Sequence, residues 1–210
     1  MRQQRFLSLV VVAAVLGLMA PAATHADLLV YATNSSTPVG ETGSFEVVVH
    51  NTGSTSYNIT SFNTLVEVVN GTGLTFTGAD GLTTSFGYIF GSVQFSPLGV
   101  VDGDTITLAD FEATGWVTLA AGASLSLGNV TYSLDAGAPL NGTNPIAINF
   151  GLTQIYDDSD PALEITLTTQ GGAVTVTGIP EPGTLVLAGL VSGLGGVCVY
   201  KRRRAGQAVA

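Results

Sequence analysis

The sequence has few charged residues, and no lysine or arginine lies between Arg5 and Lys201. Charged residues make up 10% of the 210 residues, well below the roughly 25% of an average soluble domain. The 15 Asp and Glu residues lie between Asp27 and Glu181, whereas the 6 basic residues stand near the two ends. The long central part therefore has no lysine or arginine with which to bind phosphate groups. This composition excludes a nucleic-acid-binding domain there.

The residues that carry most nucleophilic and zinc-dependent chemistry are also scarce. The single cysteine, Cys198, has no partner for an intrachain disulfide, and the two histidines are His25 and His50. A cysteine nucleophile and a multi-histidine zinc site are therefore excluded between residues 27 and 178. A catalytic triad would need His50, which alternation places opposite Phe45 as a surface strand residue. A glycosidase with paired carboxylates stays open on composition, but one tryptophan and no basic residue argue against it, so we predict no enzymatic activity.

The N-terminus has the three parts of a secretory signal peptide. Arg2 and Arg5 precede an apolar run over residues 6–20, and small residues follow up to Ala26. A positive start, an apolar centre and small residues at the cleavage site are the features of such a signal. We expect residues 1–26 to be cleaved after Ala26, with an uncleaved N-terminal anchor as the alternative. This implies the secretion translocon and signal peptidase as partners, and an exported mature chain.

A second apolar run, residues 184–200, lies near the C-terminus and is rich in glycine. As a helix with ~1.5 Å rise per residue it would reach about 25 Å, close to the ~30 Å hydrocarbon core of a bilayer. Four basic residues follow this run directly: Lys201, Arg202, Arg203 and Arg204. Because basic flanks stay in the cytoplasm, we expect a transmembrane helix over 184–200. Residues 205–210 would form a cytoplasmic tail, and residues 27–183 would lie outside.

A segment with two prolines stands directly before this apolar run. Its residues are Pro180, Glu181 and Pro182. Prolines on both sides of a glutamate prevent helix formation, so the segment is extended and accessible to a processing enzyme. The order of Pro-Glu-Pro motif, glycine-rich apolar helix and arginine cluster over residues 179–204 resembles the PEP-CTERM protein-sorting signal. The resemblance implies recognition by exosortase, a multipass membrane protease with a catalytic cysteine, which cleaves near the motif.

A plain membrane anchor, a sortase signal and a glycolipid anchor each fit fewer features of this tail. The plain anchor accounts for the apolar run and the basic stop, but not for the motif at residues 180–182. A sortase motif is absent, and glycolipid-anchor tails do not usually end in four basic residues. The resemblance therefore implies a precursor held transiently in the inner membrane of a bacterium that makes exopolysaccharide. The processed protein would then reach the cell envelope, the cell surface or the extracellular matrix.

Residues 27–178 are predicted to form one exported domain, which is long enough for a hydrophobic core. Short β-rich runs alternate with turns rich in Asn, Gly and Asp, and no segment shows sustained helical periodicity. This spacing predicts an all-β fold, a single antiparallel β-sandwich of cohesin-like, jelly-roll or immunoglobulin-like type. The expected strands lie at residues 45–50, 62–70, 74–77, 88–95, 105–108, 116–119, 124–134, 146–155, 163–169 and 173–177, with a short helical turn near 109–113.

The order of these runs resembles cohesin-like and carbohydrate-binding-module-like sandwiches. The likeness rests on a first core strand at 38–49, two further strands at 57–77, a strand after a central loop at 124–133, and a closing strand at 171–176. Such domains serve adhesion, dockerin binding or sugar binding, so the fold does not choose among them. We expect an exported, non-enzymatic protein with a structural or adhesive role in exopolysaccharide or biofilm. A polysaccharide- or dockerin-type partner-binding module is the alternative.

One acidic cluster is a candidate metal site. Asp157, Asp158 and Asp160 place three carboxylates within four residues, with no cationic residue nearby. Calcium prefers oxygen ligands and would relieve the repulsion between them. Asp102 and Asp104 form a weaker candidate, and neither segment has the spacing of an EF-hand. A solvated acidic loop without metal is the alternative, so calcium is the only cofactor that the sequence suggests.

Overall fold

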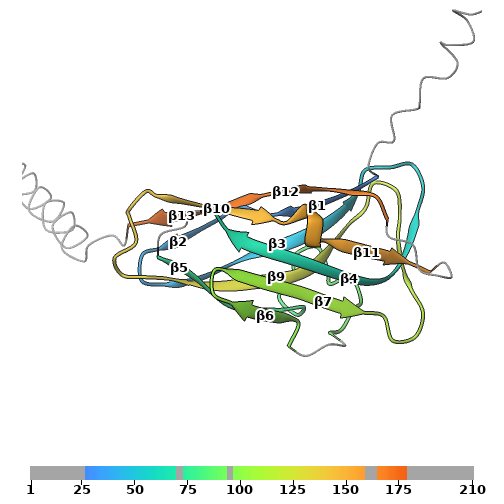
Figure 1. Cartoon of the computed structure of the whole chain (residues 1–210), viewed down its shortest axis with the longest axis horizontal. Coiled ribbons are helices and arrows are strands. Elements are labelled where there is room, and N and C mark those ends of the chain that lie inside the picture. Colours follow the sequence, from blue (N-terminus) through green and yellow to red (C-terminus); the bar gives the residue numbers. More distant parts are fainter. Residues whose placement is uncertain (1–26, 70–72, 94–96, 159–164, 179–210) are drawn as a thin grey trace, which may run out of the picture.

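The computed structural model describes residues 27–69, 73–93, 97–158 and 165–178. These residues form two β-sheets that pack face to face, with the strands running along the long axis of the molecule (Figure 1). The predicted signal peptide, transmembrane run and sorting motif lie outside the described residues. Within the part that is described, no helix is long and apolar enough to cross a membrane.

The smaller sheet, called sheet A below, has the strand order β12-β1-β3-β9-β5. Its strands are β1 (Leu28–Ala32), β3 (Thr42–Asn51), β5 (Leu74–Asp80), β9 (Ser124–Leu134) and β12 (Leu167–Gln170). The antiparallel pair β3 and β9 forms its centre. Phe45, Val47 and Val49 of β3 alternate toward the other sheet and are buried, as their spacing predicts.

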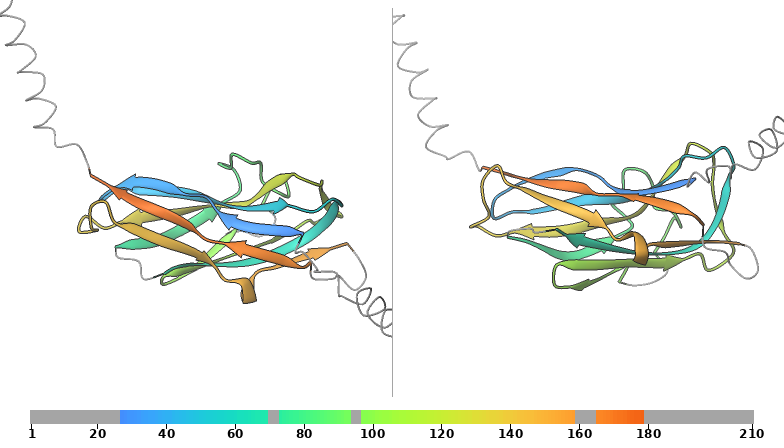
Figure 2. Two further views of the ribbon diagram at one scale, coloured as in Figure 1. Left: turned by 90° about the horizontal axis from the view of Figure 1, so that it is seen from above. Right: turned by 45° about the horizontal axis from the view of Figure 1, so that its top comes forward.

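The larger sheet, called sheet B, has the order β2-β13-β10-β4-β7-β6, and β11 and β8 also pair with β4. Its strands are β2 (Ser35–Pro38), β4 (Tyr57–Val68), β6 (Gly99–Asp102), β7 (Thr105–Phe111), β8 (Val117–Leu119), β10 (Thr143–Ile148), β11 (Gln154–Asp157) and β13 (Gly172–Thr177). One edge of β4 pairs with β7 and then β8, and the other with β10 and then β11. Between β10 and β11 the short 3-10 helix η1 (Phe150–Leu152) projects from the body of the sandwich (Figure 2).

The inner faces of the two sheets enclose one hydrophobic core. Aliphatic and aromatic side chains from both sheets are almost fully inaccessible, among them Val30, Phe62, Ile106 and Tyr132. Burying one such side chain typically stabilises a fold by about 1.5–3 kcal/mol. The core is continuous from sheet A to sheet B, which confirms the prediction of a single all-β sandwich.

Two strand pairs are parallel, which corrects the purely antiparallel sandwich expected from the sequence. β1 runs parallel to β12, and β2 runs parallel to β13. The segments 28–38 and 167–177 therefore lie side by side and pass together from sheet A to sheet B. A Cβ atom at Gly171 would collide with the carbonyl oxygen of Ile146, so this crossing requires glycine. Neither β1 nor β2 is predicted by the sequence pattern. Pro38 is tolerated in β2 because β2 is an edge strand.

Residues 88–93, the described part of the strand predicted at 88–95, do not form a strand. Tyr88 makes one isolated bridge, to Ser126 of β9, and the chain then turns away. Gly87 and Gly91 both have positive φ angles, which end any extended run on either side of this bridge. Tyr88 and Phe90 of this segment instead pack into the core.

Several other predicted boundaries are also wrong. The helical turn expected at 109–113 is the end of strand β7 and the loop after it, and strand β6 was not predicted. The run expected as one strand over 146–155 pairs along one edge of β4, but η1 divides it into β10 and β11. β12 begins at Leu167, later than the run expected from residue 163.

Candidate partner-binding face

The outer face of sheet B, which we call the β4 face, is built around the outward side chains of β4. The buried residues of β4 include Phe62, Thr64 and Val66, and the alternating residues between them are only partly buried. Three cross-strand rows make up the centre of this face: Val100 with Thr107 and Leu65, Ala109 with Asn63 and Gln154, and Phe111 with Ser61 and Tyr156. These rows combine apolar, hydroxyl and amide groups and carry no formal charge.

Among the described residues, carboxylates stand at the ends of the β4 face. Thr105 pairs with Glu67 on one side and Asp102 on the other, which places two acids at one end. At the other end, the Asn58 Nδ2 donates a hydrogen bond of 3.1 Å to the Asp158 Oδ2. A neutral centre between acidic ends suits a partner with an apolar centre and basic surroundings.

Large apolar side chains protrude from the β4 face and its rim. Val100 is 58% exposed, Phe111 43%, Trp116 55%, Phe150 62% and Leu152 53%. None of them contributes to the core. Exposed aromatic and aliphatic groups that gather on one face mark a surface for binding rather than for folding.

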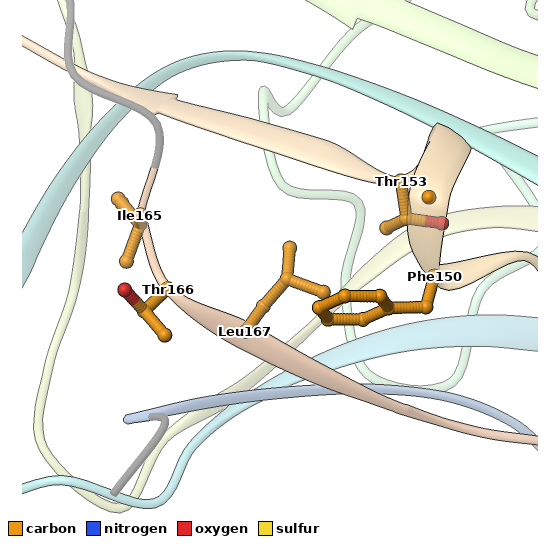
Figure 3. A pocket seen from close by; sticks show the side chains of 6 residues that line it. Phe150, Thr153, Ile165, Thr166 and Leu167 are labelled. Carbon is orange, nitrogen blue, oxygen red and sulfur yellow. The ribbon is translucent and has the colours of Figure 1, made fainter. Parts of the chain in front are cut away.

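A hollow of about 360 Å³ lies beside η1, at the rim of the β4 face. Phe150 forms one wall, and its ring points toward Leu167 (Figure 3). Thr153, Ile165 and Leu167 are almost fully buried and form the floor. The Thr153 Oγ1 donates a hydrogen bond of 2.8 Å to the Asn149 carbonyl oxygen, which closes the turn that presents Phe150. The hollow is large enough for an apolar side chain of a partner.

The outer face of sheet A is partly covered by the loop that follows β5. The Glu46 carboxylate on β3 accepts backbone hydrogen bonds from Ser85 and Phe86. The Asn129 Nδ2 on β9 donates a hydrogen bond of 2.7 Å to the Thr83 Oγ1. Glu46 and Asn129 are buried although they point away from the core. Sheet B therefore offers the more open of the two faces.

The residues predicted to bind calcium are described only in part. Asp157 ends β11, Asp158 bonds to Asn58 as above, and Asp160 lies outside the described residues. In the described ranges no group of three or more His, Cys, Asp or Glu side chains is placed to hold a metal ion. Asp102 and Asp104 flank the turn between β6 and β7. The calcium site stays a prediction.

His50 lies half-buried on the outer face of sheet A, as its alternation with Phe45 predicted. Its Nδ1 lies 2.9 Å from the Ser124 Oγ and 3.2 Å from the Ala123 carbonyl oxygen. Within the described part of the chain, no carboxylate bonds to this ring, so the pair lacks the third member of a catalytic triad.

Sequence reasoning missed the most exposed groups of the β4 face. Phe150 and Leu152 were assigned to a continuous strand, although Asn149 and Gly151 interrupt that run and signal a turn. Val100 was missed because the four-residue strand β6 is too short to show a period. The apolar residues were visible in the sequence, but their outward direction depends on tertiary pairing.

No protein-family model matches this sequence, and no curated protein sequence matches it. The fold, in contrast, is similar to solved cohesin domains. A non-cellulosomal cohesin from the archaeon Archaeoglobus fulgidus aligns with a TM-score of 0.53 and 16% identity, over 76% of this chain and 97% of that chain. The seventh ScaB type I cohesin from Pseudobacteroides cellulosolvens aligns with a TM-score of 0.55 and 11% identity, over 74% of this chain and 95% of that chain.

A type I cohesin from Clostridium thermocellum, solved as a cohesin–dockerin complex, has a TM-score of 0.54 and 13% identity, over 75% of this chain and 99% of that chain. At such identities the likeness shows the fold alone. The described domain is therefore a β-sandwich with a cohesin-like fold, which confirms that part of the resemblance seen in the sequence.

Proposed function

We propose that this sandwich is a non-enzymatic binding module that docks a partner protein of dockerin type on the β4 face. The observation that carries the proposal is the neutral centre of this face, with Val100, Phe111 and Phe150 exposed on and around it. The similar cohesin from Clostridium thermocellum was solved bound to a dockerin, which supports partner binding by this fold. Residues 27–178 contain no cysteine nucleophile and no lysine or arginine. This composition agrees with a binding role rather than a catalytic one.

The charge of the domain indicates the chemistry of its partner. All but one of the 15 acidic residues fall within residues 27–178, and none of the 6 basic residues does. The potential around the sandwich is therefore negative, and positively charged proteins approach it faster. The partner should present an apolar patch for the centre of the face and basic residues toward Glu67 and Asp158.

A photo-crosslinking amino acid placed at one position tests where the partner docks. Thr107 lies in the central row of the β4 face, and Thr75 of β5 is exposed on the outer face of sheet A. In cells that produce the full chain, we expect a discrete protein adduct from Thr107 and none from Thr75. An adduct from Thr75 alone, or the same adducts from both positions, would contradict docking on the β4 face.

We also propose that the chain is exported and sorted through its two ends. The residues that support this are the small-residue site at Ala26, the motif Pro180, Glu181 and Pro182, and the basic cluster that starts at Lys201. Translocon and signal peptidase would act on the first, and exosortase on the tail. The sandwich would then act outside the inner membrane, as an adhesive or structural element of exopolysaccharide or biofilm.

Replacing residues 180–182 by alanines tests the sorting proposal. The variant should stay in the inner membrane fraction with its C-terminus attached, while the unaltered chain reaches the surface or medium. A matched triple substitution at residues 205–207, beyond the basic cluster, should not change the distribution. Normal release of the 180–182 variant would refute the sorting role and leave the binding role untouched.

A further inference from the structure

A second hollow, of about 350 Å³, lies on the outer face of sheet A, opposite the β4 face. It is lined by Leu29 and Tyr31 of β1, His50 of β3, Ser124 of β9 and Gln170 of β12. The pairing brings these residues together, because Leu29 pairs with His50, and His50 with Ser124. Tyr31 pairs with Gln170 in the next row. Four adjacent strands thus hold the hollow in a fixed shape.

Three of these side chains bring polar atoms that the described part of the chain does not engage. The Tyr31 hydroxyl and the Gln170 amide make no hydrogen bond there. The His50 Nδ1 lies 3.2 Å from the Ala123 carbonyl oxygen, and a carbonyl oxygen can only accept. The other ring nitrogen of His50, Nε2, makes no hydrogen bond within the described residues. The hollow offers a hydroxyl, an amide and an imidazole nitrogen.

The lining also has an apolar part, and it lacks carboxylates, lysine and arginine. Tyr31 is half-buried and Leu29 lies beside it, so an aromatic ring and an aliphatic side chain share the hollow. None of the lining residues is an aspartate, glutamate, lysine or arginine. A charged ligand of either sign would find no carboxylate, lysine or arginine counter-charge in this lining. The ligand should therefore be neutral.

A sugar ring has the matching chemistry. One face of a pyranose consists of C–H groups that pack on an aromatic ring, and its rim consists of hydroxyls that both donate and accept. A volume of about 350 Å³ lies at the small end of the roughly 300–1,000 Å³ range of ligand pockets. We propose that this hollow binds a single neutral sugar unit of a polysaccharide chain, independently of the partner docked on the β4 face.

Calorimetric titration of the full chain with cellohexaose, xylohexaose and mannohexaose tests this site, in a detergent without a sugar headgroup. At least one of these neutral probes should bind, and Tyr31→Ala should weaken that binding by about tenfold. Tyr31→Phe keeps the ring and should retain most of the affinity. Phe111→Ala, on the opposite face, should not change it. Thermal unfolding of each variant checks that the fold is intact.

Two results would overturn the proposal. One is that none of the three probes binds, and the other is that Tyr31→Ala binds them as well as the unaltered chain does. If Tyr31→Ala instead abolishes the protein adduct formed from Thr107, the hollow belongs to the protein interface and the sugar site is refuted. A missing adduct from Thr107 would refute the partner-binding proposal alone, because the sugar titration does not depend on it.

Discussion

The Tyr88 hydroxyl donates a hydrogen bond of 2.5 Å to the Asp110 Oδ2, and both side chains are buried. Tyr88 belongs to the long connection after β5 of sheet A, whereas Asp110 lies on β7 of sheet B. Phe90 packs edge-on against Tyr88 with ring centroids 6.3 Å apart and stacks on Phe62 at 5.8 Å. One polar bond and two aromatic contacts thus hold this connection in the core, beside the inner side of the β4 face.

Replacing Tyr88 by phenylalanine should destabilise the fold. The variant leaves the buried Asp110 carboxylate short of one donor, and such a loss costs about 1–3 kcal/mol. Urea unfolding measures the change. Tyr31→Phe removes a hydroxyl from a half-buried surface position and serves as the matched control, with no measurable change expected. Equal stability of the two variants would show that the bond to Asp110 contributes nothing.

Alkaline pH should weaken the same connection. Burial, followed by the hydrogen bond to Asp110, raises the pKa of Tyr88 well above its usual 10.0. Below pH 10.0, the usual tyrosine pKa, this stabilisation is fully present. It is lost as the pH rises toward the raised folded-state pKa of Tyr88. The urea midpoint should therefore fall above about pH 10, and less steeply in Tyr88→Phe. Burial and Asp27 also raise the pKa of Tyr57, so some of the dependence should persist in that variant.

Acid should destabilise the loop that covers sheet A. Burial acts to raise the pKa of Asp80, but hydrogen bonds from the Thr83 and Leu82 backbone and from the Thr83 hydroxyl outweigh it, and the pKa is lowered from 3.8. This stabilisation is complete above pH 3.8 and is lost as the pH falls through the lowered folded-state pKa. Asp80→Asn keeps an acceptor without the charge. It should therefore show a flatter decline of the urea midpoint in acid, and an unchanged slope would argue against this role of Asp80.

Replacing the buried Thr64 of β4 by valine should not destabilise the fold. Among the described residues, the Thr64 Oγ1 is the buried side-chain atom with no hydrogen-bond partner. Thr64→Val removes an unsatisfied group at nearly constant volume and should raise the free energy of unfolding by about 1 kcal/mol. Thr37 is also buried, but its hydroxyl lies 2.7 Å from the Tyr132 hydroxyl. Thr37→Val should therefore lower the stability by a similar amount, and the opposite order would refute this account.

The sequence was sufficient for the fold class because alternation in strands such as β3 and β9 is strong and local. It was not sufficient for β1 and β2, whose role depends on parallel pairing with residues 167–177, far away in the chain. It also missed η1, because the run at 146–155 is strand-like except at Asn149 and Gly151, and the break there is stabilised by the hydrogen bond from Thr153 to Asn149.

The candidate site was less predictable than the fold. Sequence patterns pointed to residues with recognisable chemistry, namely the carboxylates of Asp157, Asp158 and Asp160. The β4 face has none of these, since its centre consists of ordinary residues such as Asn63 and Thr107. Only the pairing of β4 with its four neighbours brings them together and leaves Val100 and Phe111 exposed. A flat binding face of this kind has no local signature in a single sequence.

The most direct test of partner docking on the β4 face is the affinity for the partner captured from Thr107, measured by calorimetry for two matched variants. Val100→Asp adds a charge at an exposed position of edge strand β6, on the β4 face. Thr75→Asp adds the same charge at an exposed position of edge strand β5, on the opposite sheet. We predict that Val100→Asp weakens binding by at least about tenfold, while Thr75→Asp leaves it unchanged. Equal affinities of the two variants, or a loss confined to Thr75→Asp, would contradict docking on this face.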